Sequence, residues 1–165
     1  MTHIMKMCWG MYKDDLRKLL AERTDLHDCN YTDLVKLTFE TIYNSIATDS
    51  FTYRKLNLDK ITVIDNGDYQ GYLLFIIPFD TYQPDNTEYI MTYIGYGSCS
   101  GCDALQAAQS WDLDDGKLTE KQITDFMAIC KDLICNAIKP YNYGWYKDDA
   151  WCPAEEENYM QLEHF

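Results

Sequence analysis

The feature that most constrains the fold is a series of three strand-like segments whose connections are too short to contain a helix. Residues 61–64 and 71–77 are rich in β-branched and aromatic side chains, and the turn signal Asp-Asn-Gly-Asp at 65–68 lies between them. A second turn at residues 84–86 precedes a third such segment at 88–96. Parallel neighbours need a crossover of about a dozen residues or more. The pattern therefore predicts an antiparallel sheet.

Helical periodicity flanks this predicted sheet on both sides. Residues 11–23 place leucines along one side of a first helix, and Asn30 offers an N-cap for a second, strongly amphipathic one. Asp103 and Thr119 are each followed three positions later by Gln, the spacing of a capping box. They predict a short helix through Trp111 and the longest helix of the chain, to about Ile138. The expected fold is α+β: a small antiparallel three-stranded sheet with N-terminal and C-terminal helices packed on it.

Length and composition favour one domain over residues 1–165. A chain of this size can bury one ordinary core, and its 47% hydrophobic and 15% aromatic content argues against disorder. Residues 141–165 form a C-terminal tail in which aromatic and acidic side chains interleave. The sequence contains no run of about 18 apolar residues, so we expect no membrane span, and we expect no secretory leader at the N-terminus. The expected location is the cytoplasm.

The negative charge is concentrated in the C-terminal two-thirds of the chain. Residues 1–60 carry nine Lys/Arg and nine Asp/Glu, whereas residues 61–165 carry five Lys and eighteen Asp/Glu, a net of −13. Such a field repels nucleic acid and accelerates encounter with basic surfaces. We therefore expect no direct nucleic-acid binding and a basic, nucleic-acid-handling protein as the partner. The alternative is that the acidity serves only solubility.

The candidate partner-binding residues are carboxylates and large aromatic residues. The aromatic residues are of the kind that commonly anchors protein interfaces. They lie in an acidic loop and in the tail. These residues are Asp112, Asp114, Asp115, Trp145, Asp148, Asp149, Trp151, Glu155, Glu156 and Glu157.

Cys99 and Cys102 form a Cys-x-x-Cys pair at a glycine-rich turn between a predicted strand and a predicted helix. Two thiolates at this spacing can bind one metal ion from the same side, and a helix N-terminus lowers their pKa. Zinc requires four ligands, so we expect one zinc ion with Cys130, on the core face of the long helix, as the third ligand. The fourth ligand stays open among four residues and a water molecule. The four are His27, Cys29, Asp103 and Cys152.

Two other interpretations of the pair compete with a metal site. A Cys-x-x-Cys that opens a helix is also typical of thiol–disulfide oxidoreductases, although these need a βαβ unit where the chain predicts ααβββ. The pair can also be small residues packing a tight turn. The chain otherwise has no Gly-Lys-Ser/Thr phosphate loop, no Gly-x-Ser-x-Gly elbow and no His-Glu-x-x-His helix. We therefore expect a non-enzymatic protein.

The segment around the cysteine pair resembles a group of small phage and prophage proteins. The resemblance lies in Asp-Tyr-Gln-Gly at residues 68–71 and in Tyr-Gly-Ser-Cys-Ser-Gly-Cys-Asp at 96–103, followed by Leu105 and Gln106. It covers about residues 61–109. In size and acidity the chain is also similar to anti-CRISPR proteins, including zinc-containing inhibitors of type II effector nucleases.

These resemblances imply a stoichiometric inhibitor that acts in the host bacterial cytoplasm. Such a protein would dock on the basic channel of a nuclease, with a type II CRISPR effector as the candidate, and block guide or target DNA. Duplex DNA carries about one negative charge per 1.7 Å, so an acidic face can compete for the same Lys and Arg side chains. Two alternatives are a thiol–disulfide oxidoreductase that uses Cys99 and Cys102, and a zinc-stapled phage accessory or assembly protein.

Overall fold

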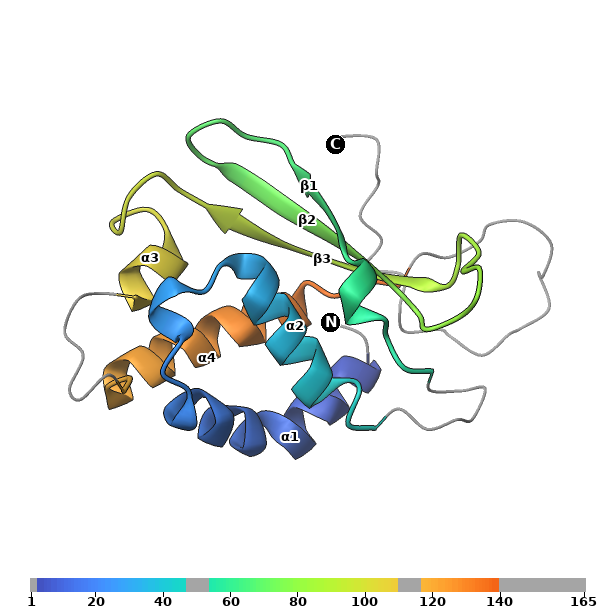
Figure 1. Ribbon diagram of the computed structural model, residues 1–165, viewed down its shortest axis with the longest axis horizontal. Coiled ribbons are helices and arrows are strands. Elements are labelled where there is room, and N and C mark those ends of the chain that lie inside the picture. The colour runs from blue at the N-terminus through green and yellow to red at the C-terminus, as the bar shows by residue number, and fades with distance from the viewer. Residues whose placement is uncertain (1–2, 47–53, 110–116, 140–165) are drawn as a thin grey trace.

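The computed structural model describes residues 3–46, 54–109 and 117–139, and these form an α+β fold (Figure 1). Two helices precede the sheet and two follow it, as the sequence predicts. The elements are α1 (His3–Glu22), α2 (Tyr31–Ile42), β1 (Thr62–Asp65), β2 (Gly71–Pro78), β3 (Tyr89–Tyr96), α3 (Ala104–Ala108) and α4 (Glu120–Cys135), with 3₁₀ turns at Leu26–Asp28 and Leu58–Lys60.

The sheet has the order β1-β2-β3, and both strand pairs are antiparallel, which confirms the prediction. The connection between β1 and β2 is closed by side chains of its own turn. Asp65 accepts a hydrogen bond from the backbone N–H of Gly67 at 3.0 Å, and Asn66 accepts one from that of Tyr72 at 2.9 Å. These Asx contacts fix the register of the hairpin locally.

Helices α1, α2 and α4 lie on one side of the sheet (Figure 1). Residues Phe75, Ile77, Ile90 and Ile94 of the strands are buried in the same apolar cluster as the inner faces of these helices. A polar contact also joins the layers, because the buried Thr92 hydroxyl donates to the Leu133 carbonyl of α4 at 2.6 Å. The helices thus cover one face of the sheet and leave the β1–β2 hairpin beyond them.

The helix starts follow the capping signals, with one difference. Asn30 with Asp33, and Thr119 with Gln122, form reciprocal capping boxes. Asp103 caps α3 by accepting from the backbone N–H of Gln106, but the Gln106 side chain bonds to the Gly97 carbonyl at 3.4 Å. The predicted end of α3 at Trp111 lies outside the described residues.

The first and last helices differ in length from their predicted bounds. Helix α1 begins at His3 rather than at residue 11, because Met5 and Cys8 continue the buried side of the helix toward its start. Helix α4 ends at Cys135 rather than near residue 138. Ile138 instead exchanges two backbone hydrogen bonds with Met91, at 2.9 and 2.8 Å, which cover part of the outer edge of β3.

Across residues 3–46, 54–109 and 117–139, no helix combines the length and the apolar character that crossing a bilayer requires.

Candidate functional site

The Cys99–Cys102 pair lies on a tight turn between β3 and α3, which we call the thiol turn (residues 97–103). The two sulfur atoms are 2.9 Å apart and both side chains are exposed. The backbone N–H groups of Cys102 and Asp103 donate to the Cys99 carbonyl at 2.9 and 2.8 Å, and the Cys99 N–H points at the Cys102 sulfur at 3.2 Å. The backbone therefore holds both thiols together on the solvent side.

A buried carboxylate anchors this turn to the helices. Asp103 is only 5% exposed, and one of its oxygens accepts from the Tyr31 hydroxyl at 3.1 Å and from the Gln106 N–H at 2.9 Å. The other oxygen accepts from the Gly97 N–H at 3.0 Å. Burial raises the pKa of Tyr31, so its hydroxyl stays protonated and donates. The sequence leaves Asp103 open as a metal ligand, but in the structure its oxygens already bind three donors.

Gly97 is required by the closeness of Cys102. A Cβ atom at residue 97 would lie 2.5 Å from the Cys102 carbonyl oxygen and 2.6 Å from its sulfur. Backbone atoms cannot yield to such a contact as a flexible side chain can. The turn thus depends on glycine at this position.

The thiol turn favours the thiolate form of Cys102. Hydrogen bonding with the Cys99 side chain is the largest cause that lowers the pKa of Cys102, and backbone donors at Cys99 and Ser98 act in the same direction. The thiolate is the form that binds metals and attacks disulfides. The exposed pair therefore includes a thiol that forms the thiolate readily, as both a metal site and a thiol–disulfide exchange site require.

Cys130 does not join this pair in the structure. Its side chain is fully buried on α4, within the apolar cluster between the helices, and burial raises its pKa to about 12. In the part of the chain that the structure describes, no group of three His, Cys, Asp or Glu side chains is arranged to hold a metal ion. The role of Cys130 as third ligand therefore stays a prediction. In the structure its side chain is buried in the apolar cluster, whereas the side chains of the pair are exposed.

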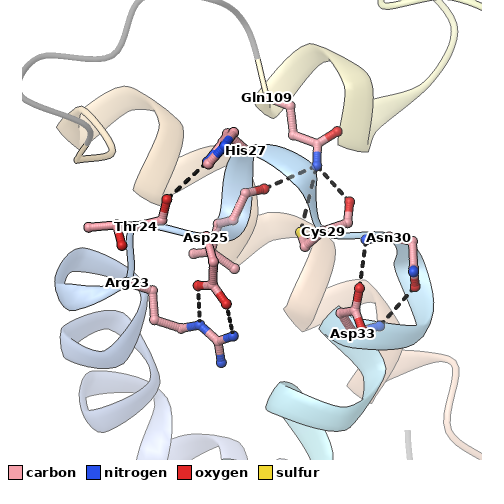
Figure 2. Close-up of polar contacts among 9 residues, drawn as sticks. Arg23, Thr24, Asp25, His27, Cys29, Asn30, Asp33 and Gln109 are labelled. Atoms are coloured by element: carbon pink, nitrogen blue, oxygen red, sulfur yellow. Dashed lines mark hydrogen bonds and ion pairs between the residues drawn. The ribbon is translucent and has the colours of Figure 1, made fainter.

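His27 and Cys29 lie in the junction between α1 and α2, as Figure 2 shows. The Gln109 amide donates to the Leu26 carbonyl at 3.0 Å and the Cys29 carbonyl at 2.6 Å, and it lies 3.6 Å from the Cys29 sulfur. Burial raises the pKa of Cys29 to about 11. The His27 ring is 2.9 Å from the Thr24 carbonyl. These two residues thus stabilise a helix junction, and Cys152 lies outside the described residues.

A shallow hollow adjoins the thiol turn, between the tip of the β1–β2 hairpin and the end of β3. Polar and aromatic side chains and two glycines surround it. The residues that line it are Asn66, Gln70, Gly71, Tyr72, Gly95, Tyr96, Cys102 and Ala104.

The ten predicted partner-binding residues, in 112–115 and 145–157, all lie outside the described residues. Within the described part, four of the exposed large apolar side chains belong to the β1–β2 hairpin, whose two faces and tip we together call the hairpin surface. Ile64 and Tyr72 lie on the face away from the helices, Val63 lies on the opposite face and Tyr69 lies in the connecting turn, with the carboxylates Asp65 and Asp68 nearby in the sequence. Tyr69 is 81% exposed. The Tyr96 hydroxyl donates to Asp65 at 2.7 Å, and this bond raises the pKa of Tyr96 to about 12. The sequence signal for this surface is the segment Ile-Thr-Val-Ile at residues 61–64, in which every side chain is β-branched and neither face of the strand carries a charge.

The thiol turn, the hollow and the hairpin surface meet at one end of the sheet, because Cys102 and residues of the hairpin line the same hollow. No family model, curated protein or solved structure matches this chain.

Proposed function

We propose that this chain is a non-enzymatic binding protein that inhibits a basic, nucleic-acid-handling nuclease, as anti-CRISPR proteins do. The observation that carries the proposal is the hairpin surface, where large apolar and aromatic side chains of β1, β2 and their connecting turn are exposed together with carboxylates. Exposed tyrosines are frequent anchors of protein interfaces. Asp65 and Asp68 add a preference for a basic partner.

The charge of the whole chain supports the same partner class. Its net charge is −13, and the described residues 3–46, 54–109 and 117–139 account for only −4 of it, with 17 Asp/Glu against 13 Lys/Arg. The remaining −9 belongs to segments that include the ten candidate residues named from the sequence. A type II CRISPR effector, with a basic channel for guide and target, is the partner we would test first.

The decisive experiment measures binding of a purified type II effector nuclease by surface plasmon resonance between about 50 and 200 mM salt. The Debye length shortens over this range, so charges on the two proteins attract each other over a shorter distance. We therefore expect the association rate to fall steeply while the dissociation rate changes little. Excess duplex DNA should compete for the nuclease. Charge reversal at Asp65 and Asp68, or at Glu155, Glu156 and Glu157, should slow association.

The matched control reverses Asp14 and Asp15, which lie in the charge-balanced N-terminal part of the chain. It should change the association rate much less. Binding that ignores salt, DNA and all of these reversals would refute electrostatic competition.

A second candidate function is favoured by the thiol turn itself. We propose that Cys99 and Cys102 act either as thiolate ligands of one zinc ion or as a thiol–disulfide exchange pair. Two thiolates of one tetrahedral zinc lie about 3.8 Å apart, given a zinc–sulfur distance of about 2.3 Å. From 2.9 Å the sulfurs need to separate by only about 0.9 Å.

Plasma emission and an insulin reduction assay separate the two roles. A zinc staple predicts close to one zinc per chain, lost together with thermal stability in Cys99→Ser or Cys102→Ser. An exchange pair predicts metal-free protein that reduces insulin with dithiothreitol as electron source and loses this activity in either variant. Metal-free, inactive protein with unchanged melting temperature in both variants would leave the cysteines as packing residues and exclude both roles.

A further inference from the structure

The β1 strand forms an open edge of the sheet. In the described part of the chain it pairs only with β2, and all four of its residues, Thr62–Asp65, are exposed. Figure 1 shows β1 at the border of the sheet that lies away from α4. The opposite edge differs, since Ile138 pairs there with Met91.

The hydrogen-bond pattern shows which backbone groups of β1 point outward. The Asn66 N–H donates to the Tyr72 carbonyl at 3.2 Å, and pairs in an antiparallel ladder alternate between bonded and non-bonded. Ile64 and Thr62 therefore bond to β2, whereas the N–H and C=O groups of Val63 and Asp65 point away from it. The same alternation explains why Met91, on the other edge, directs both its groups to Ile138.

This edge lacks several of the features with which proteins usually prevent strand addition, although β1 is short and ends at the charged Asp65. Residues 62–65 contain no proline or lysine, and their register against β2 shows no bulge. Val63 and Ile64 are β-branched and 41% and 47% exposed, so an added strand would bury apolar surface on both faces. The edge is therefore suited to accept one more strand.

Charge selects the occupant. Asp59, Asp65 and Asp68 lie in β1 or close to it in the sequence, and Lys60 is the one cation among residues 59–69. Tyr69 is exposed, and a tyrosine ring can accept a guanidinium on its face. A second copy of this chain would bring another net charge of −13, which opposes self-pairing. A basic extended segment meets no such repulsion.

We propose that the partner adds an extended, Arg- or Lys-containing segment to β1 as a fourth strand, hydrogen-bonded to Val63 and Asp65. This inference rests on the proposed protein-binding function and names the contact through which it operates. Main-chain hydrogen bonds supply affinity for any extended segment, and the exposed side chains of the hairpin surface select among such segments.

The test uses backbone chemistry, because a side-chain change cannot distinguish strand addition from ordinary contact. Val63→Pro removes an N–H that the fold does not use, and proline is tolerated at such edge positions. Val63→Ala is the matched control, since it trims the side chain and keeps the N–H. We expect binding of the effector nuclease to fall at least about tenfold in Val63→Pro relative to Val63→Ala, with circular dichroism unchanged.

Amide hydrogen exchange on the wild-type chain tests the same bonds without any substitution. At saturation with the nuclease, or with a capped heptapeptide of alternating Arg and Val, exchange at Val63 and Asp65 should slow at least about tenfold. Unchanged exchange at both amides under saturation would overturn the proposal even if Val63→Pro did not fold. Dimerisation of the free chain through this edge, seen by sedimentation and abolished by Val63→Pro, would overturn it in favour of a second copy.

The two probes separate the inference from the proposed function. A peptide that protects Val63 and Asp65 while the nuclease fails to bind would support the edge and refute the nuclease as target. A nuclease that binds without protecting either amide would refute strand addition and leave the inhibitor proposal standing.

Discussion

The thiol turn and the helical core place the same functional group in opposite environments. Cys99 and Cys102 are exposed and bond to each other and to backbone donors, whereas Cys130 is fully buried. The pKa of Cys102 is lowered and that of Cys130 is raised to about 12. The comparison teaches that fold position, rather than residue type, decides which cysteines of this chain can react or bind a metal.

The largest expected difference between the two environments is thiol reactivity. Because only the thiolate is nucleophilic, Cys102 should react with iodoacetamide at about pH 7.5 at least about a thousandfold faster than Cys130 in the folded protein. Its rate should rise with pH with a midpoint below pH 9, since its pKa is lowered from 9.0. Mass spectrometry of quenched samples measures both rates. Similar rates at the two positions, with the chain folded, would contradict the contrast.

Asp103→Ala tests the anchor that keeps the thiol turn in place. The substitution leaves the Tyr31 hydroxyl and the N–H groups of Gly97 and Gln106 without their acceptor, and it removes an N-cap. We expect a loss of about 3 kcal/mol in unfolding free energy, measured by urea denaturation. Asp125→Ala, at an exposed ion pair with Lys121, should cost less than about 0.5 kcal/mol. Equal losses would mean that Asp103 does not anchor the turn.

The smallest expected effect compares two glycines. Gly97→Ala should destabilise the protein by about 1–3 kcal/mol, because its Cβ meets the Cys102 backbone. A Cβ atom at Gly10, in α1, would meet nothing within 4 Å beyond the helix's own backbone, so Gly10→Ala should stabilise by about 0.5–1 kcal/mol. Thermal unfolding resolves the opposite signs. A stabilising Gly97→Ala would show that the turn can relax.

Local signals were sufficient to predict the sheet and most helix starts. The short connections and the Asp-Asn-Gly-Asp turn fix antiparallel neighbours, and the capping residues Asn30 and Thr119 act through contacts within one turn of the helix. The early start of α1 was missed because Lys6 and Gly10 obscure the periodicity that Met5 and Cys8 reveal once their burial is known.

The candidate site was less predictable, because its members are separated in the sequence. Helical periodicity correctly placed Cys130 on the core face of α4, but which neighbours that face meets depends on tertiary packing. The role of Asp103 depends on Tyr31, 72 positions earlier in the chain. Polar contacts at such separations leave no periodic pattern in a single sequence.

The pairing of early and late segments has a consequence for the order in which the chain can fold during synthesis. Arg17 of α1 bonds to Glu120 at the start of α4, and Met91 of β3 pairs with Ile138. About 100 residues separate α1 from α4, which corresponds to roughly 5–20 s of translation at about 5–20 residues per second. The part of the apolar cluster of α1, α2 and the sheet that α4 covers remains exposed until α4 emerges. A nascent chain arrested before residue 120 should therefore be more sensitive to protease and more dependent on chaperones than the full chain.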